Sequence, residues 1–224
     1  KEIKEENKYI ELDMDVSTVY VVDYDMKQAE VLFLSKGKNL QINEIPIINF
    51  HKEYFGGGMS SIVFQEMRES KALAYSVFST YTIPQERDKS HYSISYIGTQ
   101  SDKLTDAING MTELLNFMPE SPENMENAKE GIEQKIRTER LTKSRILSEY
   151  EKAMKMGIDY DIRKSIYNEV QNFTINDLIH FHNSHIKKDS RIIMVLGSKD
   201  DLNLDDLKQY GKIKFLTLED IFGY

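Results

Sequence analysis

Hydrophobic residues in the first half of the chain recur with the spacing of β-strands. Residues 18–22 (TVYVV) and 30–34 (EVLFL) are rich in β-branched and aromatic side chains, which favour strands. Residues 74–83 and 91–99 alternate between apolar and polar positions, and a polar turn that begins at Pro84 separates them. The pattern therefore predicts two strands near the start of the chain and a β-hairpin further on.

Helical periodicity dominates the middle of the chain. Apolar residues between positions 104 and 118 recur at i, i+3, i+4 and i+7, which is the pattern of an amphipathic helix with a wide apolar stripe. Pro119 ends this helix, and Pro122 is suited to the first turn of the next one. The same period continues through three further stretches, 125–136, 146–154 and 162–170.

The last quarter of the chain mixes both patterns. Thr174 and Asp177 resemble a capping box with Asp in place of Glu, which predicts the start of a helix. Residues 191–196 predict a buried strand, and a short acidic helix near 200–207 and a strand near 213–216 follow. Because strands and helices do not alternate regularly, a doubly wound sheet is disfavoured. The order favours an α+β fold of two layers, with helices packed on one face of a mostly antiparallel sheet.

The domain organisation follows from composition. Residues 1–17 are highly charged and hold few apolar side chains, so we expect a linker or extended arm, followed by a single domain over residues 18–224. The chain begins with neither Met nor the apolar core of a signal peptide, and we therefore expect it to be a piece of a longer polypeptide. No targeting segment assigns a compartment. No window approaches the ~20 apolar residues of a membrane span.

Charge and cysteine content exclude several classes of function. The chain has 29 Lys and Arg residues against 37 Asp and Glu residues, a formal net charge of −8. This negative field repels phosphates and disfavours nucleic-acid binding. The absence of cysteine excludes disulfides, thiolate metal sites and cysteine nucleophiles.

A glycine triplet, Gly56–Gly58, precedes Ser60 and Ser61, which are candidate N-caps of a helix that runs to about Ser70. Such a turn could bind an anion on helix N–H groups, but no Gly-Lys-Ser/Thr follows it, so it is not a Walker A motif. We favour a flexible turn where two helices meet closely. A nucleotide-binding domain is an alternative that only this turn supports.

Three histidines, His180, His182 and His185, crowd one segment and raise the question of a metal site. Their spacing does not place all three on one helical face. None of the five histidines belongs to a His-Glu-x-x-His or His-x-x-Glu-His pattern. The favoured interpretation is that they are polar residues at the end of a helix.

Arg68 and Tyr75 are the candidate catalytic residues. Arg68 lies near the end of the helix after the glycines, and Tyr75 lies at the start of the next predicted strand. A turn between them can bring both side chains to one place, where a cation and a phenol could stabilise an oxyanion. By residue type alone, the simpler interpretation is that Arg68 is a surface residue and that Tyr75 is a half-buried residue of a strand.

The segment around these residues resembles a known family. Residues 54–79 (YFGGGMSSIVFQEMRESKALAYSVFS) resemble a segment of the pitrilysin/insulinase zinc peptidases, the inverzincins, in which a glycine-rich turn, Ser-Ser, a helix ending Leu-Arg-Glu and Leu-Ala-Tyr-Ser-Val follow one another. The resemblance covers about residues 18–200. It implies a unit like that of the mitochondrial processing peptidase, with an antiparallel sheet on one side and helices on the other. Such units pair around a chamber.

The resemblance also implies a role for this chain. In the family one unit holds zinc through His-x-x-Glu-His and a downstream Glu, and the other is metal-free and contributes an Arg and a Tyr, with the spacing of Arg68 and Tyr75 here. Because this chain lacks the zinc motif, it resembles the C-terminal, metal-free domain of a zinc metalloendopeptidase. The expected partners are a zinc-binding domain, in cis or as a second chain, and a peptide substrate whose carbonyl Arg68 and Tyr75 contact. The strand from Tyr75 to Tyr81 is expected to face the chamber, and the isolated chain is expected to be inactive and to hold no cofactor.

Two residues depart from the family pattern. Ala72 stands where many members have Gly, which is harmless only if φ at this position is negative, and Lys52 stands where Asn is common. Both leave open whether the unit belongs to a working pair. The alternative is a non-catalytic assembly or peptide-binding module of the same fold. The absence of His-x-x-Glu-His from the preceding polypeptide and from any neighbouring chain would favour this alternative.

Overall fold

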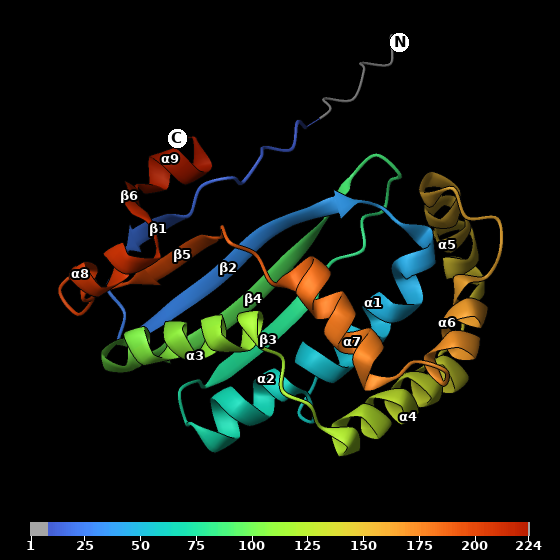
Figure 1. Cartoon of the computed structure of the whole chain (residues 1–224). Coiled ribbons are helices and arrows are strands. Elements are labelled where there is room, and N and C mark those ends of the chain that lie inside the picture. The colour runs from blue at the N-terminus through green and yellow to red at the C-terminus, as the bar shows by residue number, and fades with distance from the viewer. Residues whose placement is uncertain (1–8, 224) are drawn as a thin grey trace, which may run out of the picture.

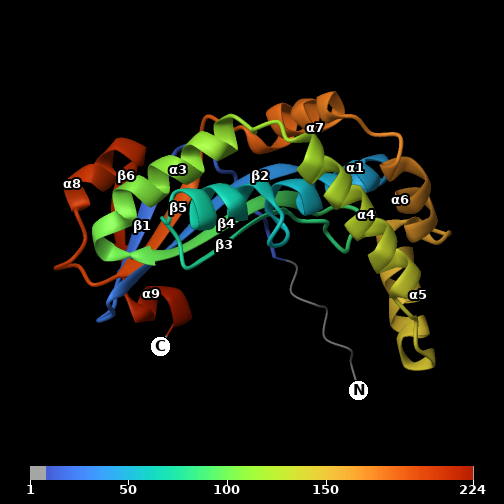
Figure 2. The same cartoon turned by 90° about the horizontal axis from the view of Figure 1, so that it is seen from below.

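The computed structural model describes residues 9–223, which form an α+β fold (Figure 1). A mixed six-stranded sheet has the order β3-β4-β2-β5-β1-β6. Most helices cover one face of it, whereas α9 lies beside the opposite face (Figure 2). The expected two-layer α+β architecture is confirmed.

The strands are β1 Thr18–Asp23, β2 Gln28–Asn39, β3 Ser76–Tyr81, β4 Ser90–Gln100, β5 Ile192–Gly197 and β6 Lys212–Leu216. The α-helices are α1 Ile45–His51, α2 Ile62–Phe64, α3 Leu104–Asn116, α4 Pro122–Thr138, α5 Lys143–Met156, α6 Ile162–Val170, α7 Ile175–Phe181, α8 Leu204–Leu207 and α9 Leu218–Phe222. Short 3₁₀ or π segments are η1 Ile42–Glu44, η2 Lys52–Gly56, η3 Gln65–Ser70, η4 Ser101–Lys103, η5 His182–Ile186 and η6 Lys208–Tyr210.

The sheet joins the two ends of the chain. β2, β3 and β4 pair antiparallel, and β5 pairs antiparallel with β2. β1 lies between β5 and β6 and pairs with both in parallel, so that Thr18 is opposite Ile192 on one side and Lys212 on the other. β5 is half-buried rather than fully buried as predicted, because helices cover only the face that Ile193 and Val195 share.

The alternation predicted for β4 is present, but small polar residues occupy its buried face. Ser93 and Ser95 are buried, whereas Tyr92, Ile94 and Tyr96 are only partly buried and lie on the other face. The Ser95 hydroxyl lies 2.8 Å from that of Ser79 on the neighbouring strand, so the two satisfy each other.

The glycine-rich turn explains why this face carries small residues. A Cβ atom built on Gly56 would lie 2.1 Å from the carbonyl oxygen of Ser79 in β3. The main chain at the end of η2 therefore passes almost directly over a strand. The helical segments on either side of these glycines, η2 and α2, contact each other as expected, and a further close contact joins η2 to the sheet.

Local start signals of helices are confirmed. Ser61 caps α2 by accepting a hydrogen bond from the Phe64 N–H, and η3 continues the helix to Ser70. Pro122 opens α4, and Thr174 and Asp177 form a reciprocal capping box at α7. The sequence interpretation missed α9, which begins with the same capping box at Thr217 and Asp220.

Residues 9–17 of the predicted arm contain no helix or strand, and residues 1–8 lie outside the described part of the chain. Hydrogen bonds nevertheless attach the arm to the domain. Both carboxylate oxygens of Glu11 accept hydrogen bonds from the Ser90 N–H at 3.2 Å, and the Met14 carbonyl accepts one from the Ser190 hydroxyl at 2.9 Å. Across residues 9–223, every helix is too short or too polar to cross a bilayer.

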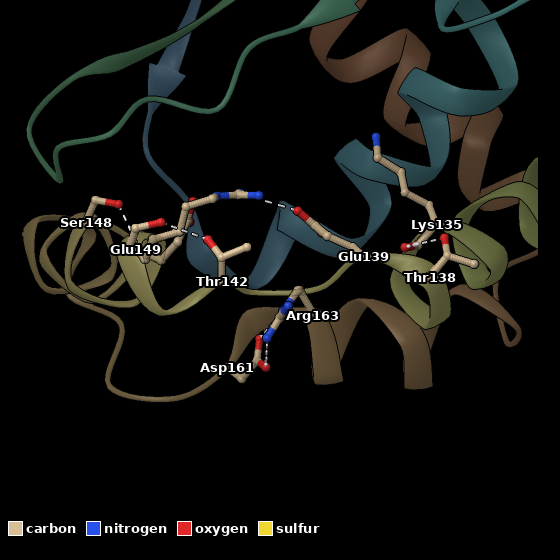
Figure 3. A network of polar contacts seen from close by, with 10 residues as sticks. Lys135, Thr138, Glu139, Thr142, Ser148, Glu149, Asp161 and Arg163 are labelled. Carbon is tan, nitrogen blue, oxygen red and sulfur yellow. Dashed lines mark hydrogen bonds and ion pairs between the residues drawn. The ribbon is translucent and has the colours of Figure 1, made fainter.

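The core lies between the sheet and its helices. It includes Val19, Val21, Val31, Phe33, Ile97 and Val195 from the strands and Ile48, Phe50, Met67, Ile108, Met111, Leu115 and Leu178 from the helical layer. α5 contributes only Met156 to the buried set. Arg145 of α5 pairs with Glu139, at the end of α4, at 3.5 Å, and with Glu149 within α5 at 3.0 Å. Glu139 and Glu149 are among the residues labelled in Figure 3.

Candidate functional site

Arg68 and Tyr75 lie on opposite sides of one turn and line the same open pocket, of about 420 Å³. Arg68 belongs to η3, and Tyr75 immediately precedes β3. The Tyr75 N–H donates to the Gly98 carbonyl at 2.8 Å, which attaches the residue to β4. The pocket is also lined by Glu69, Ala72, Leu73, Ala74, Thr99, Gln100 and Lys103.

The Arg68 side chain is 47% exposed, and its guanidinium carbon lies 4.9 Å from the centre of the Phe64 ring. Its Nε atom lies 3.9 Å from the Glu69 carboxylate, which is 55% exposed. An exposed ion pair of this length is worth less than ~1 kcal/mol, so Glu69 competes weakly with another partner for the guanidinium. Arg68 therefore brings an available positive charge to the pocket.

The Tyr75 side chain is 51% exposed, and its hydroxyl accepts a hydrogen bond from the amide nitrogen Nε2 of Gln100. An amide N–H can only donate, so the phenol proton is left free for another acceptor. Sequence reasoning missed Gln100. The antiparallel hairpin was a usable signal, because it places the start of the first strand beside the end of the second.

Ala72 has φ = +49°, the only positive value at a non-glycine residue between positions 9 and 223. The condition under which this departure from Gly is harmless is therefore not met. Hydrogen bonds hold the turn in this conformation: Lys103 Nζ donates to the Ala72 carbonyl at 3.1 Å, and the Leu73 N–H donates to that of Met67 at 2.8 Å. Lys52, the other departure, is exposed on η2.

We expect Ala72→Gly to raise the free energy of unfolding by about 0.5–1 kcal/mol. The left-handed conformation costs a residue with a Cβ roughly 1–2 kcal/mol, and the greater freedom of Gly in the unfolded chain offsets part of the relief. Urea denaturation measures the change. The matched control is Ala74→Gly in the same turn, where φ is not positive and a loss of about 0.5–1 kcal/mol is expected. Equal losses in both variants would contradict the strain.

The histidines are core residues rather than polar residues at a helix end, apart from His180, which is exposed. His182 and His185 are buried on η5, and His51 and His91 are buried beside them. His185 Nε2 lies 3.5 Å from a Glu44 carboxylate oxygen. Across the described residues, no three His, Asp or Glu side chains are arranged to hold a metal ion.

The hydrogen bonds of His182 assign its tautomer. Its Nε2 lies 3.1 Å from the Leu115 carbonyl, which only accepts, so Nε2 carries the proton and Nδ1 is an acceptor. Nδ1 in turn lies 3.1 Å from His51 Nε2, which must donate. This leaves His51 Nδ1 buried without a partner. Burial is the main cause that lowers the pKa of His182 to about 4, and it brings the pKa of His51 well below the ordinary value.

Comparison with known proteins places the chain in a family. The family model of the peptidase M16 inactive domain matches residues 4–132. The structure is similar to a peptidase M16 inactive domain from Pseudomonas fluorescens (TM-score 0.71, 15% identity, covering 86% of this chain and 46% of that one). It is also similar to a protease from Helicobacter pylori (TM-score 0.70, 14% identity, covering 88% and 48%) and to a candidate zinc protease from Bordetella pertussis (TM-score 0.58, 14% identity, covering 75% and 93%).

At these identities the structural likeness shows the fold alone, and the chain spans about half the length of the first two relatives. A search of curated proteins found no match. The family match nevertheless covers more than half of the chain and includes the glycine-rich turn, Arg68 and Tyr75. The chain therefore belongs to the peptidase M16 family, and its domain is of the type that the family model describes as inactive.

Proposed function

We propose that this domain is the metal-free, C-terminal part of a zinc metalloendopeptidase and supplies Arg68 and Tyr75 to the carbonyl of a bound peptide. The observation that carries the proposal is that both side chains line one open pocket, with the phenol proton of Tyr75 free to donate. A zinc-binding domain, in cis or as a second chain, completes the enzyme. Membership of the peptidase family and the likeness to proteases support this partner.

The roles of the two residues follow from their chemistry. A zinc ion bound in the partner domain would supply an activated water for attack on the peptide carbonyl. As the carbonyl oxygen becomes an oxyanion, the Tyr75 hydroxyl donates a hydrogen bond to it, and Arg68 places a positive charge beside it. Neither residue activates water itself. The isolated chain is therefore expected to cleave no peptide.

The test is Tyr75→Phe in the complete protein with its zinc-binding domain. We expect kcat/KM for peptide hydrolysis to fall by about 10²-fold, the usual effect of removing one oxyanion donor, while the ring packing is kept. Tyr160→Phe is a matched control, because Tyr160 is 50% exposed and lies in the connection between α5 and α6. The control should cleave like the wild type.

Two results would change the interpretation. Equal kcat/KM for Tyr75→Phe and wild type would limit this domain to shaping the chamber. Failure of the wild-type protein to cleave a broad set of peptides would favour a peptide-binding or assembly module. The partly exposed Phe78 and Tyr96, whose rings stack 5.4 Å apart, would then be part of its contact surface.

A further inference from the structure

The Tyr75 hydroxyl is held by a side chain from a distant part of the sequence. We propose that Gln100 is a positioning residue that fixes the phenol of Tyr75 and directs its proton into the pocket. The inference rests on the proposed function, because it assigns a second residue to the same step. It is carried by the hydrogen bond from Gln100 Nε2 to the Tyr75 hydroxyl and by the shared pocket.

Two contacts attach Tyr75 to the same strand. Gly98 of β4 accepts the main-chain N–H of Tyr75 at 2.8 Å, and Gln100, the last residue of β4, donates to the hydroxyl at the far end of the side chain. β4 lies between β3 and β2, and at its end Gln100 is paired with Gln28 of β2. The phenol is therefore held at both its main-chain and its hydroxyl end before a substrate arrives, which reduces the cost of ordering it.

The direction of this hydrogen bond matters as much as its presence. A hydroxyl has one proton and two lone pairs. The Gln100 amide N–H occupies one lone pair of the Tyr75 oxygen, so the phenol proton points away from Gln100. Accepting this hydrogen bond also makes the hydroxyl a stronger donor to another acceptor. A carboxylate at position 100 would have the opposite effect, because it could only accept and would take the phenol proton away from the pocket.

Gln100→Glu in the complete protein tests this directly. The side chain keeps its size and reverses the hydrogen bond, so we expect kcat to fall by at least about tenfold with KM nearly unchanged. Gln100→Leu, which removes the donor without adding an acceptor, should lower kcat less. Gln85→Glu is the control, because Gln85 is exposed in the turn between β3 and β4, at the opposite end of the hairpin, and the substitution introduces the same charge there. It should leave kcat unchanged.

A double-mutant cycle with Tyr75→Phe separates this inference from the proposed function. Gln100→Glu should cause no further loss once the hydroxyl is absent, because its effect passes through that group. The role of Gln100 is overturned, and the proposed function stands, if Tyr75→Phe lowers kcat but Gln100→Glu does not. The same holds if the fold-loss in kcat of the double variant equals the product of the two single losses. If Tyr75→Phe itself has no effect, the proposed function is overturned and the inference with it. Urea denaturation of each variant identifies a loss that comes from unfolding.

Discussion

The free energy of unfolding of this domain is expected to fall by about 2 kcal/mol through His182 alone when the pH is lowered from 7.5 to 5. The pKa of His182 is about 4 in the folded protein, against about 6.5 for an unperturbed histidine. Between these values the unfolded chain takes up a proton that the folded protein does not. The stability is therefore complete above pH 6.5 and decreases as the pH approaches 4. The lowered pKa of His51 acts in the same direction.

The arrangement of the two rings explains why the folded protein resists protonation. A proton on His182 Nδ1 would oppose the N–H of His51, 3.1 Å away. A proton on His51 Nδ1 would place a charge on a buried atom without a partner. The nearby guanidinium of Arg191, which shares the Leu115 carbonyl with His182, adds repulsion. His185 differs, because Glu44 favours its charged form and works against the effect of burial on its pKa.

Urea denaturation at a series of pH values between 7.5 and 5 measures the effect, since most Asp and Glu side chains stay ionised in this range. His182→Gln keeps a donor for Leu115 and an acceptor for His51 but does not titrate, so its pH dependence should be weaker. His180→Gln, at the exposed histidine, should match the wild type. A flat profile for the wild type would contradict the prediction. Imidazole NMR titration of His182 gives a second reading if the variant does not fold.

Gly56→Ala is expected to destabilise the domain by about 3 kcal/mol or more. The new Cβ would lie 2.1 Å from the Ser79 carbonyl oxygen and 2.7 Å from the Ser79 Cα. These are main-chain atoms of β3, which is paired with β4, and they cannot move aside as the end of a flexible side chain can. Since φ at Gly56 is not positive, the added methyl group causes no backbone strain, and the whole effect is steric.

Gly131→Ala in α4 is the matched control. Its Cβ would meet only the Glu53 side chain, at 3.6 Å, and Ala is favoured over Gly in a helix by about 1 kcal/mol. Thermal and urea unfolding should therefore show the two variants moving in opposite directions. A Gly56→Ala protein as stable as the wild type would mean that η2 can move away from β3 at little cost.

Signals that act within a few residues were predictable from the sequence. Helices start at Ser61, Pro122 and Thr174 through interactions within the first helical turn. All the residues involved are neighbours in the sequence, so the sequence alone indicates these starts. The alternation of β4 likewise predicted two faces. It could not indicate that serines occupy the buried face, because that depends on how closely Gly56 approaches from another element.

Features that depend on tertiary contacts were mispredicted or left open. His182 lies just beyond α7 in the sequence, and only its contact with Leu115, 67 positions away, makes it a core residue. Ala72 has a positive φ because hydrogen bonds from both sides hold its turn. For the site, the residue pattern and the family resemblance gave Arg68 and Tyr75 as candidates, and the structure places both beside one pocket. Gln100 donates a hydrogen bond to the Tyr75 hydroxyl across the hairpin, 25 positions away, and only an alignment of the two strands could have indicated this contact.

The position of β1 between β5 and β6 affects how the domain can fold during its synthesis. A ribosome makes β1 before the two strands that flank it, which end at Gly197 and Leu216. About 170 residues must therefore be added before β1 finds its first neighbour, which takes on the order of 10–30 s at typical rates of translation. During this time β2, β3 and β4 can already pair, because all three are complete by Gln100. Throughout this interval β1 is an apolar strand without its neighbours, and an unpaired strand can pair with another chain.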